Sequence, residues 1–485
     1  MTEETLHQKT VKGAAWSFAD NFLSLGISFI VGIILARLLS PEEYGLIGII
    51  TIFVNVFNSI VDSGFSNALI RKNDASDTDY NTVFWSNLFV SSIMCLALFL
   101  CSEPIAIFFE RPELKALTQV MSIIVIINAF AIVQRTLLVK KIDFKTQTKV
   151  SLIASITSGV IGVGMAMMGF GVWSLVGQQI SRQLFNTVFL WILNKWRPQK
   201  LFSWLSFKEL FGFGWKLLVS SLINTTWNEL YQVVIGKCYN SSTLGLYTRA
   251  QQFASLFSSN ITTVVQRVSY PALSSIKEDN IHLKAAYQRV IKVTMLVTFT
   301  LMLGLAGVAD KFVYVLVGEK WMECVPMLQI LCFQMMLFPL HAINLNMLQV
   351  QGRSDLFLKL EIIKKAAAIV PLLLGVFVGI YWMLIGSVVI SFFSYYLNAY
   401  YSGPFLNYSI KEQVKDILPS LAIALFMSGG IYCLGFINIS VFLLLPLQIV
   451  TGGSIIIFFC EIFKLPEFLE VKEVIKKGIN KKKWM

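Results

Sequence analysis

The sequence predicts an all-α polytopic membrane protein with about fourteen transmembrane helices, and three observations support this fold class. Hydrophobic residues make up 56% of the 485 residues and charged residues only 14%, whereas soluble domains carry about 25% charged residues. Apolar segments close to the ~20 residues that a spanning helix needs recur along the whole chain. Lys and Arg concentrate in alternate connections between these segments, as cytoplasmic loops do. Too little chain remains between the segments for a folded soluble domain.

The apolar segments form two groups of six and a final pair. The first six are expected at 14–36, 44–66, 81–101, 115–136, 147–168 and 172–194. The second six are expected at 211–236, 243–270, 288–309, 325–349, 359–380 and 382–402, and the pair at 417–436 and 440–463. The predicted organisation is therefore an N-terminal lobe over 1–194, an interfacial linker over 195–210, a C-terminal lobe over 211–402, two extra helices within 403–463 and a basic tail over 464–485.

The distribution of Lys and Arg predicts the orientation in the membrane. With the N-terminus placed inside, 31 of the 40 Lys and Arg residues fall in cytoplasmic segments and six in outer segments. Because cytoplasmic loops retain positive charge, both termini are expected in the cytoplasm of a bacterial inner membrane. This topology also explains the net charge of +12, so no nucleic-acid partner is expected. The N-terminus lacks a signal-peptide layout, and the first apolar segment is expected to be an uncleaved helix.

A weak internal repeat relates the two groups of six helices. Gly13-Ala-Ala-Trp16 aligns with Gly212-Phe-Gly-Trp215 at an offset of 199, and the segment 40–45 aligns with 240–245 at an offset of 200. Six helices is an even number, so both repeats begin on the same side of the membrane and are parallel. Parallel repeats are typical of transporters that bind substrate between two lobes and alternate between inward-open and outward-open states.

Polar stripes on four of the predicted helices indicate a water-filled cavity. In the helix 211–236, polar residues recur every four positions and therefore share one face: Lys216, Ser220, Asn224, Asn228 and Gln232. Similar faces occur in the predicted helices 14–36, 44–66 and 243–270. The residues expected to line the cavity are Asn21, Asn55, Gln178, Asn224, Asn228 and Gln252. The alternative is that such side chains only hydrogen-bond neighbouring helices.

Basic residues within or beside the predicted spans indicate an anionic substrate, because a charge at the bilayer centre costs roughly 2.5–3.5 kcal/mol. The predicted cationic cavity consists of Arg182, Arg249, Lys216, Arg37 and Lys237. For Arg182 the alternative is a structural ion pair. For Arg37 and Lys237 it is a side chain that extends to the membrane surface.

Acidic residues in the predicted spans are candidates for coupling transport to Na⁺ or H⁺. These candidates are Asp20, Asp62 and Glu229, although Asp62 is also close enough to the cytoplasm to be solvated. His341 is isolated and is expected to be a packing residue. The seven cysteines are scattered, and the sequence has no metal-ligand set, no nucleophile–base pair and no phosphate-binding Gly loop. We therefore expect no metal, no cofactor and no enzymatic activity.

Three motifs resemble those of polysaccharide flippases. Leu35-Ala-Arg-Leu-Leu-Ser-Pro-Glu-Glu-Tyr-Gly45 is similar to the L-A-R-x-L-x-P-x-x-Y/F-G segment between their first two helices. Gly171-Val-Trp-Ser-Leu-Val176 is similar to their G-x-W-[AS]-L-V motif at helix 6. The basic stretch from Arg135 to Phe144 resembles that of colanic acid and teichuronic acid exporters. The chain thus resembles Wzx-type flippases of the multidrug/oligosaccharidyl-lipid/polysaccharide superfamily over its twelve-helix core.

The resemblance implies a flippase for undecaprenyl-diphosphate-linked oligosaccharide in surface polysaccharide biosynthesis, such as O-antigen, capsule or exopolysaccharide. It also implies alternating access of a monomer surrounded by membrane lipids, with other polysaccharide-assembly proteins as partners. Two alternatives stay open: a multidrug or cation antiporter of the same superfamily, whose cavity would more often favour acidic residues, and a membrane polysaccharide polymerase, which usually has a large outer loop.

Overall fold

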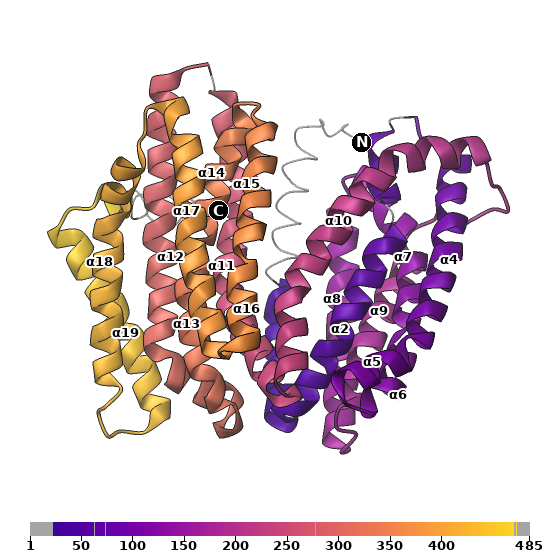
Figure 1. Cartoon of the computed structure of the whole chain (residues 1–485), viewed down its shortest axis with the longest axis horizontal. Helices are drawn as coiled ribbons and strands as arrows, with labels where there is room; N and C mark the ends of the chain where they lie inside the picture. Colours follow the sequence, from indigo (N-terminus) through magenta and orange to yellow (C-terminus); the bar gives the residue numbers. More distant parts are fainter. Residues whose placement is uncertain (1–22, 63, 73, 277, 470–471, 473–485) are drawn as a thin grey trace, which may run out of the picture. The chain divides into compact units, whose positions relative to one another are not determined.

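The computed structural model describes residues 23–62, 64–72, 74–276, 278–469 and 472, and these residues form helices and no strand (Figure 1). The chain divides into two compact units, Met1–Gly245 and Leu246–Met485. Each of the fourteen predicted segments is helical over most of its described residues. The all-helical fold class predicted from the sequence is therefore confirmed.

Helices of the first unit are joined mostly by short connections, and a longer non-helical segment, 194–203, links α9 to α10. They are Leu23–Leu38, α2 (Pro41–Asp62), α3 (Phe65–Arg71), α4 (Asp77–Leu100), α5 (Ser102–Phe109), α6 (Glu113–Met121), α7 (Ile123–Lys140), α8 (Phe144–Met167), α9 (Trp173–Leu193), α10 (Trp204–Cys238) and the first turn of α11 (Ser241–Ser275). Most of α11 belongs to the second unit.

The second unit also contains α12 (Asn280–Val317), η1 (Glu319–Cys324), α13 (Val325–Met335), α14 (Phe338–Val350), α15 (Ser354–Ala367), α16 (Ile369–Phe377), α17 (Ile380–Ser402), η2 (Gly403–Leu406), α18 (Ile410–Leu434) and α19 (Val441–Ile462). The two extra helices predicted at the C-terminus are α18 and α19. Helix α18 packs along α12, where Lys292 pairs with Asp416 at 2.9 Å and Ser428 donates to the carbonyl of Leu303 at 2.7 Å.

Nine helical segments of the described residues have the length and composition to cross a membrane. Helices α9, α10 and α11 are not among the nine, although predicted spans coincide with them. These three helices carry Arg182, the polar stripe of α10 and Arg249, respectively. The polar side chains of these three helices lower their mean hydropathy, which is why they do not meet the criterion for a membrane-spanning helix.

The start of α10 differs from the expected boundary between linker and helix. The helix begins at Trp204 rather than at residue 211, because Ser203 caps it by accepting a hydrogen bond from the Ser206 N–H at 3.3 Å. Helix α10 packs against α2 and α3 within the first unit. The compact unit therefore extends past the end of the predicted N-terminal lobe, and the sequence-based lobe boundaries stay a prediction.

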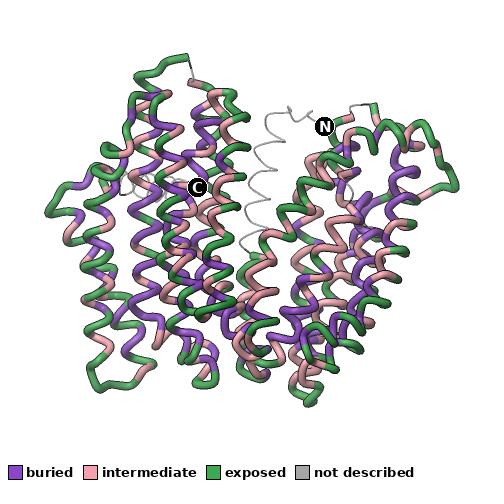
Figure 2. The backbone as a smooth tube through the Cα atoms, viewed as in Figure 1, coloured by how far each residue is buried: buried purple, intermediate pink, exposed green. Residues whose placement is uncertain are grey.

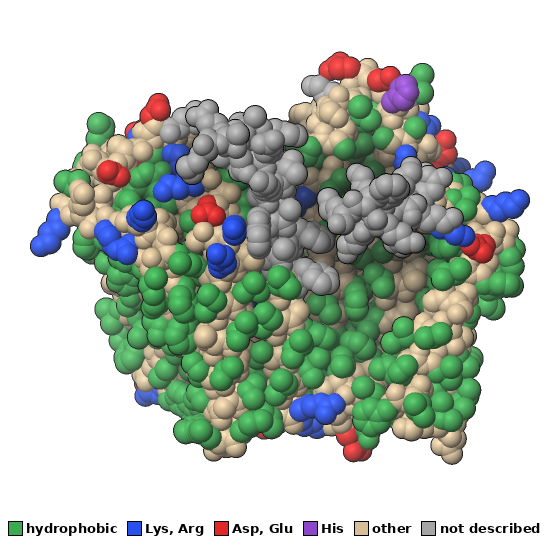
Figure 3. Space-filling view, turned by 180° about the vertical axis from the view of Figure 1, so that it is seen from behind, with side chains coloured by type: hydrophobic (Ala, Val, Ile, Leu, Met, Phe, Trp, Pro, Cys, Tyr) green, Lys and Arg blue, Asp and Glu red, His purple; other side chains and the backbone are tan. Residues whose placement is uncertain are grey.

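Burial and surface composition in each unit suit a membrane environment. Buried residues follow the inward faces of the packed helices, as the tube in Figure 2 shows. The core of the first unit includes Phe65, Tyr80 and Phe84, and that of the second includes Tyr287 and Trp321. On the face drawn in Figure 3, hydrophobic side chains cover the flanks of both units, and charged side chains gather toward the helix ends.

Candidate functional site

A polar pocket of about 470 Å³ lies in the first unit among α2, α3, α7 and α10. Its polar lining consists of five amides, three hydroxyls and two carboxylates: Asn55, Asn58, Asn67, Asn128 and Asn228; Ser59, Ser221 and Thr225; Asp62 and Glu229. Leu217 and Leu218 also contribute to the lining. The pocket lies toward the C-terminal end of α2, which the charge distribution predicts to be the cytoplasmic end.

Hydrogen bonds between α2 and α10 form one wall of the pocket. The Asn55 Nδ2 donates to Glu229 Oε1 at 2.9 Å, and the Gln232 Nε2 donates to the other carboxylate oxygen at 2.8 Å. One turn along both helices, the hydroxyls of Ser59 and Thr225 lie 3.0 Å apart. The four-residue spacing in each helix produces these two successive contacts. Asn55, Glu229 and Asn228, all singled out from the sequence, therefore meet in one place.

An amide chain extends from the pocket to a third helix. The Asn128 Nδ2 of α7 donates to Asn58 Oδ1 of α2 at 3.1 Å. The Gln183 Nε2 of α9 donates in turn to Asn128 Oδ1 at 3.0 Å. Sequence reasoning missed Asn128, which is an isolated polar residue in an apolar span, and Gln183, which is next to the more conspicuous Arg182.

Asp62 is the last residue of α2 and lies in the pocket lining. The Ser66 hydroxyl donates to its Oδ1 at 2.6 Å, and Asp62 also interacts electrostatically with Arg135 of α7. Arg135 belongs to the basic stretch noted in the sequence, and in the structure it lies close enough to Asp62 to interact with its charge.

The predicted cations of the first unit lie outside the pocket lining. Arg182 is exposed on α9 and Lys216 is exposed on α10. Arg37 is exposed one residue before the helix Leu23–Leu38 ends. Lys237 pairs with Glu110 at 2.8 Å, and its Nζ lies 5.2 Å from the centre of the Phe108 ring. A substrate role for these four residues stays a prediction, and Lys237 has a structural partner.

Several predicted polar residues have other surroundings or are not described. Gln178 packs against α8, since a Cβ on Gly162 would lie 2.8 Å from its Cβ. Asn224 is exposed on α10 without lining the pocket, and Gln252 is exposed in the second unit. Asp20 and Asn21 lie outside the described residues.

Arg249 lies in the interior of the second unit with only 4% of its surface exposed. Its guanidinium lies 5.2 Å from the centre of the Trp321 ring and 5.7 Å from that of Phe253. Aromatic faces attract a guanidinium more strongly when it is desolvated. In this structure Arg249 therefore packs beside two aromatic rings, and its role toward a substrate stays a prediction.

His341 matches the packing role expected from its isolation in the sequence. It is half-buried in α14, where its Nε2 lies 3.2 Å from the Ser391 hydroxyl of α17. Among the described residues, no group of three or more His, Cys, Asp and Glu side chains is arranged to hold a metal ion.

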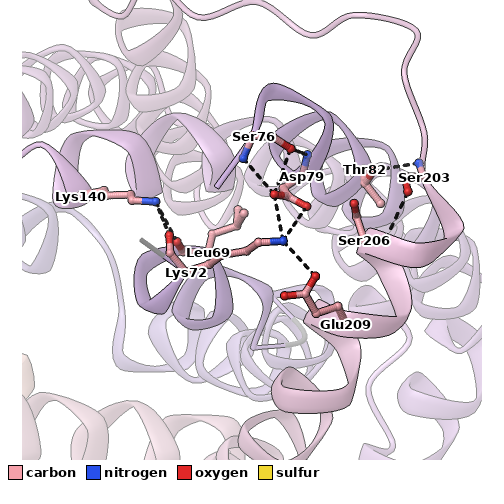
Figure 4. Close-up of polar contacts among 9 residues, drawn as sticks. All are labelled: Leu69, Lys72, Ser76, Asp79, Thr82, Lys140, Ser203, Ser206 and Glu209. Carbon is pink, nitrogen blue, oxygen red and sulfur yellow. Dashed lines mark hydrogen bonds and ion pairs between the residues drawn. The ribbon is translucent and has the colours of Figure 1, made fainter. Parts of the chain in front are cut away.

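A cluster of charges joins α3, α4 and α10 at one end of the first unit, as Figure 4 shows. The Lys72 Nζ lies 3.2 Å from Asp79 Oδ2 and 2.9 Å from Glu209 Oε2. The hydrogen bond to Glu209 raises the pKa of Lys72 above its ordinary value. The Lys140 Nζ donates to the carbonyls of Lys72 at 2.6 Å and Leu69 at 3.3 Å, which satisfies the C-terminal end of α3.

Backbone contact between two repeat-related helix starts supports the internal repeat. A Cβ on Gly45 of α2 would lie 1.7 Å from the carbonyl oxygen of Ser241, and a Cβ on Gly245 of α11 would lie 1.9 Å from that of Pro41. The repeat aligns Gly45 with Gly245 and Pro41 with Ser241. The contact is therefore reciprocal, as a two-fold relation between equivalent segments requires.

Comparison with known proteins shows similarity to polysaccharide export proteins. The chain is 29% identical over 328 residues to the succinoglycan biosynthesis transport protein ExoT of Rhizobium meliloti, covering 67% of this chain and 66%, just under two thirds, of that protein. It is 26% identical to the teichuronic acid biosynthesis protein TuaB of Bacillus subtilis, with 73% of each chain covered. It is 25% identical to the lipopolysaccharide biosynthesis protein WzxC of Escherichia coli, with 76% of each covered.

Solved structures with lower sequence identity to this chain confirm the fold. The family follows from a separate match to a family model. A structure of the lipid II flippase MurJ, in an inward closed conformation, is 16% identical with a TM-score of 0.71, covering 93% of this chain and 98% of that one. An inward-facing multidrug resistance transporter of the MATE family, in the MOP superfamily, has a TM-score of 0.61 at 16% identity, covering 79% of this chain and 95% of that one. The family described as polysaccharide biosynthesis protein matches residues 34–326. The match spans more than half of the chain, so this protein belongs to the polysaccharide biosynthesis protein family.

Proposed function

We propose that this protein is a flippase that moves an undecaprenyl-diphosphate-linked oligosaccharide from the cytoplasmic to the outer leaflet of a bacterial inner membrane. The transported oligosaccharide would then enter a surface polysaccharide. The observation that carries the proposal is the polar pocket among apolar helices of a protein in the polysaccharide biosynthesis family. A bundle with only a structural role has no need for a polar void of about 470 Å³ within its membrane helices.

In this proposal, the headgroup enters from the cytoplasm and the lipid tail stays in the bilayer. Translocation occurs by alternating access, with both termini in the cytoplasm. The exposed side chains of Arg182 and Lys216 contribute positive charge for the diphosphate, because cations pair well with phosphate oxygens. Asp62 and Glu229 are the described candidates for coupling to a Na⁺ or H⁺ gradient.

The multidrug antiporter of the same superfamily is the alternative transporter function. The acidic residues of the pocket, Asp62 and Glu229, favour this alternative. The similarity to the three polysaccharide proteins over two thirds or more of the chain favours the flippase.

Deletion of the gene in the source bacterium tests the proposed function. The flippase account expects loss of one surface polysaccharide and accumulation of its lipid-linked precursor in the cytoplasmic leaflet. Plasmid-borne wild-type protein should restore export, whereas Arg182→Ala and Lys216→Ala should restore little at equal protein level in the membrane. Normal surface polysaccharide and normal precursor levels in the deletion strain would exclude this function. Raised drug sensitivity in place of these changes would support the antiporter.

A further inference from the structure

We propose that the pocket of the first unit binds an uncharged, hydroxyl-rich group, a sugar ring of the substrate, rather than its diphosphate. This inference rests on the proposed function for the source of the sugar. The geometry of the pocket itself is independent of that function.

The lining of the pocket offers hydrogen-bond donors and acceptors in the mixture that sugar hydroxyls use. A hydroxyl both donates and accepts, an amide side chain has two donors and one accepting oxygen, and a carboxylate only accepts. Five amides, three hydroxyls and two carboxylates supply all of these groups within about 470 Å³. Small-molecule pockets typically measure about 300–1,000 Å³, so one or two sugar rings are a suitable occupant.

The charge of the lining disfavours a phosphate. Asp62 and Glu229 line the pocket, and the described lining residues include no Lys or Arg. Two like charges 4 Å apart repel by about 1 kcal/mol in water and by more in a less polar medium. The exposed Arg182 and Lys216 lie outside this lining, so the diphosphate is better accommodated near them than inside the pocket.

Three pocket residues have side chains that are available to a ligand. Asn67 on α3 and Ser221 and Asn228 on α10 make no side-chain hydrogen bond to any other described residue. They lie on two elements of the pocket wall, whereas Asn55, Asn58 and Asn128 are held by their neighbours. The held amides provide a rigid wall, and the three available groups provide the contacts to hydroxyls.

Sugar binding by the full-length protein in lipid nanodiscs tests the inference directly. Saturation-transfer NMR would be measured with glucose, galactose and N-acetylglucosamine, and separately with inorganic diphosphate. We expect transfer to the ring protons of at least one neutral sugar. Asn67→Leu and Asn228→Leu each remove hydrogen bonds and should weaken that binding about tenfold. Asn228→Gln keeps the amide and should weaken it less.

Asn224→Leu is the matched control, because Asn224 lies on α10 one turn from Asn228 and does not line the pocket. It should bind sugar as the wild type does, and equal thermal unfolding midpoints would establish that the variants are folded. The inference is overturned if no neutral sugar binds, if the two Leu variants bind like the control, or if the same substitutions weaken diphosphate instead. The gene deletion tests the flippase function and the NMR measurement tests the sugar site, so a failure of one proposal can be told apart from a failure of the other.

Discussion

The two units differ in the surroundings of the polar side chains compared here: those of the first unit line a pocket, and those of the second unit form a buried hydrogen-bonded network. In the first unit, α2 and α10 leave a pocket between partly exposed amides, and three of its polar residues have no described partner. In the second unit, Tyr287, Asn344 and Ser402 are buried and bonded to one another, with both hydroxyls donating to Asn344 Oδ1 at 2.8 and 2.7 Å. A polar residue in a predicted span therefore lines a cavity in one unit and is enclosed within a hydrogen-bonded network in the other.

The largest expected effect comes from removing the aromatic core beside Arg249. Trp321 is fully buried, so Trp321→Ala leaves a cavity and removes a ring from the guanidinium. We expect a loss of about 3–5 kcal/mol in unfolding free energy. Chemical unfolding in detergent measures it, with Trp382→Ala as the control because Trp382 is exposed in the same unit. Equal stability of the two variants would show that Arg249 has a different environment.

An intermediate effect is expected at the charge cluster of the first unit. Lys72→Met leaves the carboxylate of Asp79, only 3% exposed, without its cationic partner. Asp79 keeps its hydrogen bonds from Ser76, and losing one hydrogen bond to a charged group costs roughly 1.5–3 kcal/mol. Glu209→Gln is the control: Glu209 is 59% exposed, and exposed ion pairs contribute about 0–1 kcal/mol. A larger loss for Glu209→Gln than for Lys72→Met would contradict this order.

Removing one hydroxyl from the buried network of the second unit, or one from the pocket of the first unit, should change the unfolding free energy less. Tyr287→Phe removes a buried hydroxyl from the network of the second unit and should cost about 0.5–1.5 kcal/mol. Ser59→Ala removes a hydroxyl from the pocket wall, where water can hydrogen-bond to Thr225 instead, and should cost less. Equal losses would mean that the pocket is as dry as the interior of the second unit.

The smallest effect concerns pH and the exposed pair of Glu110 and Lys237. The hydrogen bond from Lys237 lowers the pKa of Glu110 below its ordinary value. A depressed carboxyl pKa stabilises the fold above the unfolded-state value, and this contribution is lost as the pH falls through the folded-state pKa. Lys237→Met should therefore slightly reduce the dependence of the unfolding midpoint on acid pH. An unchanged pH profile in this variant would contradict the pairing.

The sequence was most informative where one physical rule dominates. The length of the apolar segments predicts fourteen helices, because each helix must cross about the same thickness of hydrocarbon. Four-residue polar spacing predicts polar faces on the segments that form α2 and α10, and the structure brings these faces together at Asn55 and Glu229. The start of α10 was misplaced, since the aromatic residues near Trp204 serve equally in an interfacial linker and a helix.

Tertiary partners account for what the sequence did not reveal at the site. Trp321, an aromatic neighbour of Arg249, is distant in the chain and is brought close only by folding, so no local pattern indicates this contact. Arg135 was grouped with neighbouring lysines, although its electrostatic partner Asp62 is on another helix. Single amides such as Asn128 gave no periodic signal, and their role emerges only from the bond to Asn58.

Translocation by the purified protein in proteoliposomes tests the central claim most directly. A lipid-linked oligosaccharide with a fluorescent sugar would be placed in both leaflets, and quenching by a membrane-impermeant reductant would be followed over time. The account predicts quenching beyond the outer-leaflet half in vesicles with the wild-type protein, and slower quenching with Asn228→Leu than with Asn224→Leu. Quenching that stops at half in every sample, with correctly folded protein in the bilayer, would contradict it.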